Sequence, residues 1–231
     1  MTNRKISLAE GEYHHVYNRG NSKQNIFLDD KDYDRFTKLL YLCNSKKSIN
    51  FRDDIIKPKI DAWDFDRGEI LVSIGAWVLM PNHFHIYITP SPRSHLGQIG
   101  DSADAIAYYM KKLCTAYSMY FNKKHERTGK LFEGPFKSTY VNSDEYAKYL
   151  FSYIHMNPVK LIDPLWKENG IKDIGKTLRF LNTYRWSSYH DYHGKKRPEN
   201  KIISPKDFPE YFSDPQVFDE EIFDWLNFKE D

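Results

Sequence analysis

The 231-residue chain lacks the features that define several simple protein classes. It has only two cysteines, Cys43 and Cys114, which excludes a disulfide framework or a cysteine-based metal cluster as its structural basis. Both fall inside apolar helical patterns, which indicates reduced core residues. The longest apolar run, from Ile70 to Met80, is too short to span a bilayer, and the first residues lack the form of a signal peptide. We therefore expect a cytoplasmic protein without a membrane segment.

Common catalytic signatures are missing as well. The sequence has no Gly-rich phosphate-binding loop, and no Ser-His-Asp or Cys-His order stands out. Aromatic residues, in contrast, are abundant at 16% of the chain, with 17 Tyr, and 29% of the residues are charged. This composition predicts a soluble globular protein with one domain and an appendage, or two small domains. Most aromatic side chains will serve packing, although those beside basic residues also suit stacking on unpaired bases.

The net charge of +2 hides an uneven distribution of charge along the chain. Residues 207–231 contain nine acidic residues against one lysine, so the rest of the chain is markedly basic. We interpret residues 1–195 as the main domain and residues 196–231 as an acidic C-terminal tail. Basic residues are dense between Lys111 and Lys137, a pattern typical either of a solvated surface or of a face that binds nucleic-acid phosphates.

Hydrophobic periodicity predicts a regular order of strands and helices. The predicted strands are Glu12–Arg19, Ile70–Met80, the stretch that starts at His83, and Phe136–Val141. The predicted helices begin at Asp29 or Asp30, at Ser102, and within Asn142–Glu145, with a further one at Ile174–Leu181. This order predicts an α+β fold, a ferredoxin-like antiparallel sheet with helices on one face and a C-terminal helical extension. The polar connection Asn44–Glu69 is long, and we interpret it as an excursion with short structure of its own.

The stretch Trp77–Ile88 carries the first chemical signal. Its Pro81-Asn82 turn leads into a strand on which His83 and His85 are two residues apart. Because side chains alternate along a strand, both imidazoles point to one face and Phe84 points to the other. Two histidines at this spacing can bind one metal ion, whereas the alternative is one structural and one surface histidine. Two ligands do not complete a coordination sphere, so a metal site requires a further donor.

The helix that ends at Asn157-Pro158 carries the second signal. Tyr153 and Asn157 are four residues apart and share a helix face, although Asn157 also suits a simple helix cap. Tyr146 and Tyr149 lie near the same face, so a mechanism that uses both Tyr149 and Tyr153 remains open on spacing alone. A phenol, with a reference pKa of about 10, attacks a phosphodiester only when a cation polarises it. A tyrosine beside a metal therefore indicates a phosphotyrosine intermediate, which conserves the bond energy for rejoining.

Several strings in the sequence resemble those of a known family. Met80-Pro-Asn-His-Phe-His85 resembles the HUH motif of single-tyrosine transposases. Other strings follow in the order found in REP-associated tyrosine transposases: Tyr17-Asn-Arg-Gly-Asn21, Gly129-Lys-Leu-Phe-Glu-Gly134, Phe136-Lys-Ser138, Tyr153-Ile-His-Met-Asn-Pro-Val159 and Trp186-Ser-Ser-Tyr189. The resemblance extends from about Tyr13 to Tyr192. It implies a ferredoxin-like fold, a Mg²⁺ or Mn²⁺ ion, and cleavage of single-stranded DNA near hairpins through a 5′-phosphotyrosine.

The resemblance also implies roles for individual residues. Residues 1–195 correspond to the catalytic domain, His83 and His85 to metal ligands, Asn157 to the third ligand and Tyr153 to the nucleophile. Basic residues are expected to bind the nucleic acid: Arg19, Lys111, Lys112, Lys123, Lys124, Arg127, Lys130 and Lys137. The expected assembly is a monomer or a homodimer. Pro135 departs from the family pattern, because many relatives have an arginine there that would contact a phosphate.

Two other functions fit parts of the sequence. A nucleic-acid-binding module without chemistry would use the sheet to stack unpaired bases, but would need neither the histidine pair nor Tyr153. A metal-dependent hydrolase would use the histidine pair with water in place of tyrosine as the nucleophile. The strand-transfer enzyme is the function that uses both signals.

Overall fold

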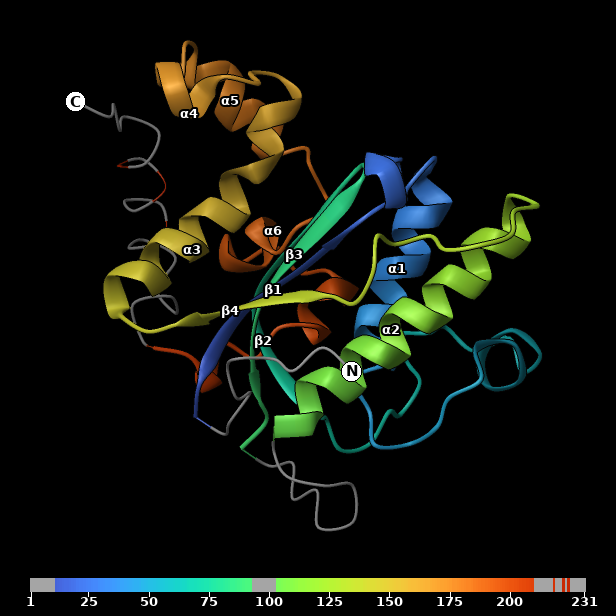
Figure 1. Cartoon of the computed structure of the whole chain (residues 1–231). Helices are drawn as coiled ribbons and strands as arrows, with labels where there is room; N and C mark the ends of the chain where they lie inside the picture. Colours follow the sequence, from blue (N-terminus) through green and yellow to red (C-terminus); the bar gives the residue numbers. More distant parts are fainter. Residues whose placement is uncertain (1–10, 93–102, 210–217, 219–221, 223, 225–231) are drawn as a thin grey trace.

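A four-stranded antiparallel sheet forms the centre of the computed structural model, which describes residues 11–92 and 103–209 together with residues 218, 222 and 224. Its strand order is β2-β3-β1-β4 (Figure 1). The strands are β1 (Tyr13–Arg19), β2 (Val72–Met80), β3 (His83–Pro90) and β4 (Lys137–Val141). This pairing and the order of strands and helices along the chain confirm the predicted ferredoxin-like sheet.

Two long helices, α1 (Asp30–Leu42) and α2 (Ala103–Lys124), pack together on one face of the sheet (Figure 1). The N-cap of α1 is Asp29, whose side chain accepts a hydrogen bond from the N–H of Asp32 at 3.0 Å. Ser102, where the second long helix was predicted to begin, lies outside the described residues. The layer between these helices and the sheet consists of buried apolar side chains that include Val16, Phe36, Leu40, Phe84 and Tyr117.

The helix α3 (Asp144–Met156) covers the opposite face of the sheet (Figure 1). It begins after Ser143, whose hydroxyl accepts a hydrogen bond from the N–H of Tyr146. Buried side chains of α3, Leu150 among them, pack with Val78 of β2 in a second apolar cluster. The two helices between the strands thus share one face, as predicted, and α3, which follows the last strand, covers the other, because every residue of β2 is apolar or small and needs cover on both sides.

After α3 the chain forms the predicted C-terminal helical extension. Its elements are the 3₁₀ helices η3 (Asn157–Leu161), η4 (Pro198–Lys201) and η5 (Pro205–Asp207) and the α-helices α4 (Trp166–Asn169), α5 (Ile174–Leu181) and α6 (Tyr189–Tyr192). Within the segment interpreted as a tail, the N–H of Ser204 donates to the carbonyl oxygen of Ile74 at 2.8 Å. The ring of Phe208 packs directly on Gly75. A Cβ atom added at Gly75 would lie 2.8 Å from carbon atoms of that ring. The boundary at residue 195 stays a prediction, but residues just beyond it pack against β2.

The excursion between α1 and β2 has the short structure that its length suggested. It contains one stretch of π-helix, η2 (Phe51–Ile56). The side-chain oxygen of Asn44 accepts hydrogen bonds from the N–H groups of Leu71 and Val72, and its amide nitrogen donates to the carbonyl oxygen of Val72. These bonds tie the two ends of the excursion together at the start of β2.

Both cysteines are reduced in the structure, as the sequence predicted. Cys43 and Cys114 are free thiols, and burial raises the pKa of each to about 12. Both are therefore protonated at neutral pH and poorly reactive. Over the part of the chain that the structure describes, no helix combines the length and the apolar character that crossing a membrane requires.

Candidate active site

The two histidines of the His-Phe-His stretch stand at the start of β3, on the sheet face that α3 covers. In the strand pairing, His85 lies opposite Tyr17 of β1, and His83 lies opposite Arg19. Phe84, between the two histidines, points into the apolar layer beneath α1 and α2. This alternation agrees with the spacing of two residues read from the sequence.

A tight turn after β1 closes this end of the sheet. The N–H of Gly20 donates to the carbonyl oxygen of Asn82 at 2.8 Å, which links the turn to the one that precedes His83. A Cβ at Gly20 would lie 2.1 Å from the carbonyl oxygen of Gln24, so this turn requires glycine. The string Tyr17–Asn21 therefore fixes how close the end of β1 approaches the histidine strand.

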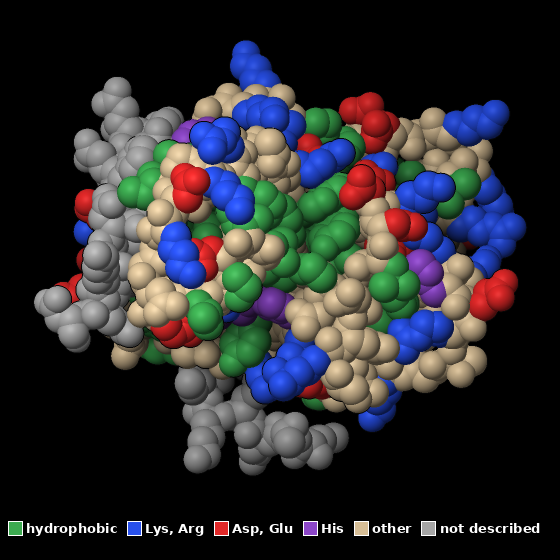
Figure 2. Space-filling model, turned by 90° about the horizontal axis from the view of Figure 1, so that it is seen from above, with side chains coloured by type: hydrophobic (Ala, Val, Ile, Leu, Met, Phe, Trp, Pro, Cys, Tyr) green, Lys and Arg blue, Asp and Glu red, His purple; other side chains and the backbone are tan. Residues whose placement is uncertain are grey.

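An open groove of about 700 Å³ lies over this end of the sheet. Its lining comes from β1, the 3₁₀ helix η1 (Asn21–Lys23) after it, the turn before β3, the start of β3 and the segment that leads into β4: Tyr17, Asn18, Arg19, Lys23, Asn82, His83, His85, Glu133, Gly134, Pro135 and Lys137. Figure 2, which looks down on the molecule from above, shows histidine surface between apolar surface and clusters of lysine and arginine. The groove thus combines imidazoles with a basic rim.

The helix α3 brings Tyr153 to the histidines. The ring centroid of Tyr153 lies 5.4 Å from that of His85, edge to face, and 6.3 Å from that of His15. Asn157, the C-cap residue of α3, is fully buried, and its side chain lies beside His83. The structure therefore brings together four residues that come from two separate stretches of the sequence.

Three tyrosines form a row of rings along α3. The centroid of Tyr149 is 6.0 Å from that of Tyr153 with an angle of 9° between the planes, and Tyr146 is 6.3 Å from Tyr149. Tyr149 is half-buried beside its neighbours, and Nζ of Lys167 lies 3.4 Å from its hydroxyl. Tyr153, at the C-terminal end of the row, is in contact with His85.

Hydrogen bonds orient both imidazole rings of the pair. Nδ1 of His83 lies 2.6 Å from Oδ1 of Asn82, and Nδ1 of His85 lies 2.8 Å from Nε2 of His15. When each Nδ1 carries the proton, His83 and His85 donate these bonds and present Nε2 as a ligand atom.

The same three imidazoles are held in their neutral form. Burial lowers the pKa of His15 to about 4, and burial together with the charge of Lys160 lowers that of His83 to about 4. Burial is also the main reason why the pKa of His85 lies well below its ordinary value. At pH 7 all three rings are neutral, which is the form that binds a metal ion.

These side chains fit a divalent cation. Both polar atoms of the Asn157 amide are buried, and neither makes a hydrogen bond of ordinary geometry within the described residues, although the amide lies close enough to His83 to oppose the lowering of its pKa. An amide oxygen left unpaired in this way is costly, and it suits Mg²⁺ or Mn²⁺ beside imidazole ligands. Among the described residues, those of this site included, no group of three or more His, Cys, Asp or Glu side chains could hold a metal ion, so the fit depends on the amide of Asn157. The candidate ligand set is therefore two imidazoles and one amide.

A chain of buried hydrogen bonds fixes α3 to β2 near Tyr153. Nδ1–H of His155 donates to the carbonyl oxygen of Phe151 at 2.8 Å, and Nε2 accepts from the hydroxyl of Ser188 at 2.7 Å. The hydroxyl oxygen of Ser188 accepts from the backbone N–H of Trp77 at 2.9 Å. Burial lowers the pKa of His155 to about 3, so the ring is neutral, as this pattern requires. The Trp-Ser-Ser-Tyr string thus serves to hold the tyrosine helix in place.

Four residues around Tyr153 and His85 were not predicted as site residues from the sequence. His15 and Tyr17 alternate on β1 and share a face, but only the pairing of β1 with β3 places them beside His85. Lys160 lies on η3, directly after the tyrosine helix, and the turn between η3 and α4 brings Lys167 back towards the ring of Tyr153. Alternation in the first strand was the one signal that could have indicated His15.

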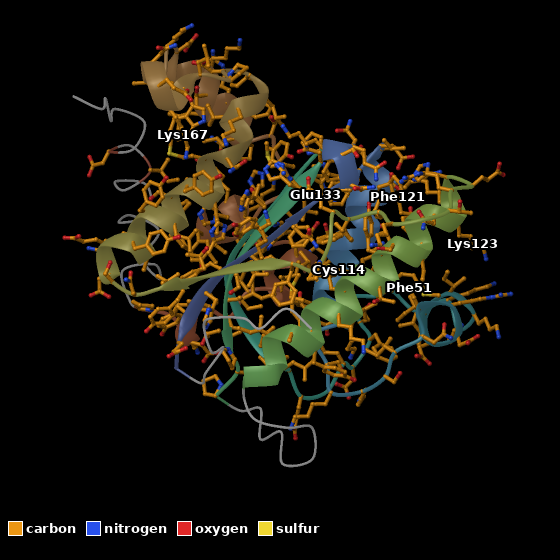
Figure 3. The ribbon with its side chains drawn as sticks, viewed as in Figure 1. Phe51, Cys114, Phe121, Lys123, Glu133 and Lys167 are labelled. Atoms are coloured by element: carbon orange, nitrogen blue, oxygen red, sulfur yellow. The ribbon has the colours of Figure 1, made fainter. Side chains whose placement is uncertain are left out.

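The basic residues predicted to bind nucleic acid separate into two groups. Arg19 and Lys137 line the groove beside the histidines. The others belong to α2 and the loop after it, on the other face of the sheet: Lys111, Lys112, Lys123, Lys124, Arg127 and Lys130. Figure 3 shows Lys123 at the end of α2, well away from Glu133 at the end of the sheet.

Two lysines of the second group have partners within the protein. Nζ of Lys112 donates to two backbone carbonyl oxygens of the excursion at 2.6 and 2.8 Å. Lys124 forms ion pairs with Asp29 and Asp32 at the start of α1. These contacts attach α2 to the neighbouring elements, so both side chains stabilise the fold whether or not they contact DNA.

The rim of the groove carries an ion pair. The guanidinium of Arg19 lies 2.7 Å from the carboxylate of Glu133. The backbone N–H of Glu133 also donates to the carbonyl oxygen of Arg19, which holds the two residues side by side. Pro135 lines the groove where the family resemblance would place an arginine. Lys23 and Lys137 are further cations of the lining.

Comparison with known proteins finds solved structures to which this chain is similar. No family model and no curated protein matches the chain. A solved structure described as a REP-associated tyrosine transposase bound to a REP hairpin matches with a TM-score of 0.46 and 12% identity, over 90% of this chain and 91% of that one. This chain is similar to that transposase in overall arrangement. A candidate transposase from Deinococcus radiodurans matches with a TM-score of 0.33 and 14% identity, over 64% of this chain and 92% of that one. Similarities at this level do not by themselves define a function.

Proposed function

We propose that the protein is a transposase-type enzyme that cuts and rejoins single-stranded DNA through a covalent tyrosine intermediate. The observation that carries this proposal is the contact between Tyr153 of α3 and His85 of β3, with His83 and Asn157 beside them. A nucleophile, a candidate metal site and a basic groove thus lie at one end of one sheet. The family strings in the sequence support the same function.

The proposed reaction exchanges one phosphodiester for another. The phenolic oxygen of Tyr153 forms a bond to phosphorus, and the bond from phosphorus to the 3′ oxygen breaks. The phenol proton passes to solvent, and the 3′ oxygen takes up a proton to give a free 3′-hydroxyl. The fragment on the 3′ side of the cut stays bonded to Tyr153 through its 5′-phosphate, as a 5′-phosphotyrosine. Attack by a 3′-hydroxyl on this phosphotyrosine rejoins the DNA and releases the tyrosine, because the bond energy is conserved.

The residues that would hold a Mg²⁺ or Mn²⁺ ion are His83, His85 and Asn157. When bound, such an ion polarises the phosphodiester and stabilises the charge that develops on its oxygens. All three ligands are neutral, so they leave the charge of the cation available to the anionic substrate. His15 and Asn82 orient the two imidazoles, as outer-shell partners of metal ligands do.

We propose single-stranded DNA near a hairpin as the substrate, as the family strings imply. The groove is open and basic, with Arg19, Lys23 and Lys137 in its lining, so the phosphates of an extended strand can lie along it. Tyr17 also lines the groove and offers an aromatic face on which an unpaired base can stack.

The test is to incubate the protein with hairpin DNA and Mg²⁺ or Mn²⁺ and to separate the products on a denaturing gel. We expect a covalent protein–DNA band from the wild-type protein and from Tyr149→Phe, which serves as the matched control. Tyr153→Phe should keep its fold and its DNA binding but give no such band. Mass spectrometry of the adducted peptide then identifies the modified tyrosine.

The other outcomes separate the competing functions. Cut DNA without a covalent band would indicate a metal-dependent hydrolase. DNA that is bound but unchanged would indicate a binding module without chemistry. An adduct on Tyr149, or one that persists in Tyr153→Phe, would contradict the assignment of the nucleophile.

A further inference from the structure

Two lysines approach Tyr153 from the chain that follows its helix. Nζ of Lys167 lies 4.0 Å from the ring centroid of Tyr153, and Nζ of Lys160 lies 5.6 Å from it. Nζ of Lys167 is also 3.4 Å from the hydroxyl of Tyr149. Neither lysine is accounted for by the ligand set or by the basic groove lining.

Local structure holds both ammonium groups at this place. Lys160 is three residues after Asn157 on η3, and in a 3₁₀ helix residues three apart lie on the same side. Lys167 follows Trp166, which is only 5% exposed and anchors the short helix α4 in the second apolar cluster. Figure 3 shows Lys167 between α4 and α3. The two cations therefore reach the tyrosine from elements that are packed, not from a loose side chain on the surface.

Both lysines also lie within electrostatic reach of the candidate metal ligands. The charge of Lys160 contributes to the lowered pKa of both His83 and His85, and the charge of Lys167 contributes to that of His85, in each case after burial. The two ammonium groups therefore lie near both the tyrosine and the candidate metal site, where an anionic substrate group would be attracted to them.

We propose that Lys160 and Lys167 form the binding site for the phosphate that Tyr153 attacks and then carries. This inference rests on the proposed function and names two residues that touch its substrate. Both ammonium groups donate hydrogen bonds to the non-bridging phosphate oxygens, before the attack and in the phosphotyrosine. A purely structural role, in which each ammonium only packs on an aromatic face, would leave phosphate binding unchanged when the lysine is removed.

The first experiment measures phosphate recognition without chemistry. Hairpin oligonucleotides with a 5′-phosphate or a 5′-hydroxyl are titrated into Tyr153→Phe protein in EDTA, so that only protein groups contact the phosphate. We expect tighter binding of the 5′-phosphate form, and loss of that advantage when Lys160→Ala or Lys167→Ala is added. Lys176→Ala, which removes an exposed lysine of α5, is the matched control and should keep the advantage. The ratio of the two affinities does not depend on the fraction of folded protein.

The second experiment measures adduct formation in protein that retains Tyr153. Removal of either lysine should slow single-turnover adduct formation by about 10- to 100-fold, the effect expected when a charged hydrogen bond is lost. Lys→Arg at either position should restore part of the rate because it keeps the charge. Lys176→Ala should leave the rate unchanged.

The outcomes distinguish this site from the proposed function. If the 5′-phosphate gives no advantage in Tyr153→Phe, or the same advantage in the double lysine variant, the phosphate site is rejected. Adduct formation that is normal in both lysine variants also rejects it while leaving the function intact. If wild-type protein forms no adduct at all, the proposed function fails, and the affinity ratio alone decides whether the lysines bind phosphate.

Discussion

Several polar side chains of the candidate site lower the stability of the folded protein unless a ligand binds to them. The buried amide of Asn157 makes no hydrogen bond of ordinary geometry within the described residues, and such a group costs about 1–3 kcal/mol. Burial also keeps three imidazoles neutral next to cations. A fold selected for stability alone would place apolar side chains here, so these residues indicate a ligand.

Replacement of Asn157 with leucine tests this directly. Asn157→Leu should raise the free energy of unfolding in EDTA, by up to about 1–3 kcal/mol, because it removes the unpaired polar atoms. The wild-type protein should gain stability with added Mn²⁺, since a ligand of the folded state stabilises it, and the variant should lose this response. Thermal unfolding with and without Mn²⁺ measures both effects. Tyr153→Phe is the control that should still gain stability with Mn²⁺. If Asn157→Leu gains as much stability as the wild-type protein, Asn157 is not a ligand.

Protonation of His155 should couple stability to pH. Its pKa is about 3 in the folded protein and about 6.5 in the unfolded chain. Between these values the unfolded chain binds a proton that the folded protein does not, so stability is complete above pH 6.5 and falls as the pH decreases towards 3. The slope approaches about 1.4 kcal/mol per pH unit for one such histidine. Urea unfolding at pH 7 and pH 5 should show the loss, and His155→Phe should show a shallower slope; an equal slope would contradict this origin.

At the scale of elements, the position of α3 determines whether Tyr153 meets the histidines. Its apolar face packs on the sheet, and the His155–Ser188–Trp77 hydrogen bonds set its register against β2. Apolar packing alone tolerates small shifts along a helix axis, whereas directional hydrogen bonds do not. A polar chain in an otherwise apolar cluster therefore specifies where the tyrosine stands.

Ser188→Ala should break this register. The variant leaves Nε2 of His155 and the N–H of Trp77 without their partner, at a cost of about 1–3 kcal/mol in the free energy of unfolding. The adduct yield at a temperature where the variant is folded should also fall, because Tyr153 is held less firmly. Ser187→Ala is the matched control, since Ser187 is also buried but its hydroxyl has only a long contact of 3.4 Å with the N–H of Tyr189. Equal effects of the two substitutions would argue against a specific role for Ser188.

For the molecule as a whole, the two faces of the sheet do different work. The face under α1 and α2 is an apolar layer, while the other face carries the histidines and is closed by α3 and the C-terminal segments. Phe208 and Phe218 belong to this second cluster, so the C-terminal region completes the core instead of only adding charge. The groove opens at the end of the sheet where neither layer covers the histidines.

The position of the groove predicts which lysines contribute to DNA binding. Lys137→Ala should weaken hairpin binding and reduce the slope of log affinity against log salt by about 0.7, the value for one lost phosphate contact on a single strand. Lys112→Ala should leave that slope unchanged, because its ammonium is bound to backbone carbonyl groups on the other side of the sheet. Fluorescence anisotropy at several salt concentrations measures both. A smaller slope for Lys112→Ala than for Lys137→Ala would show that the strand follows α2 instead.

The sequence by itself determined the features that depend on local periodicity and turn chemistry. Alternation along a strand was sufficient to put His83 and His85 on one face, and the four-residue spacing on a helix was sufficient to pair Tyr153 with Asn157. The capping residues Asp29 and Ser143 mark helix starts for the same local reason. The order of elements then predicted the sheet.

Only the tertiary structure decided which of these local faces meet. The pairing of β1 with β3 placed His15 beside His85, and the packing of α3 on the second face of the sheet placed Tyr153 between that histidine and Lys167. It also separated Lys112 from the groove, although charge counting treated all lysines alike. The physical reason is that strand register and helix docking are set by contacts between residues distant in the chain, which local periodicity does not encode.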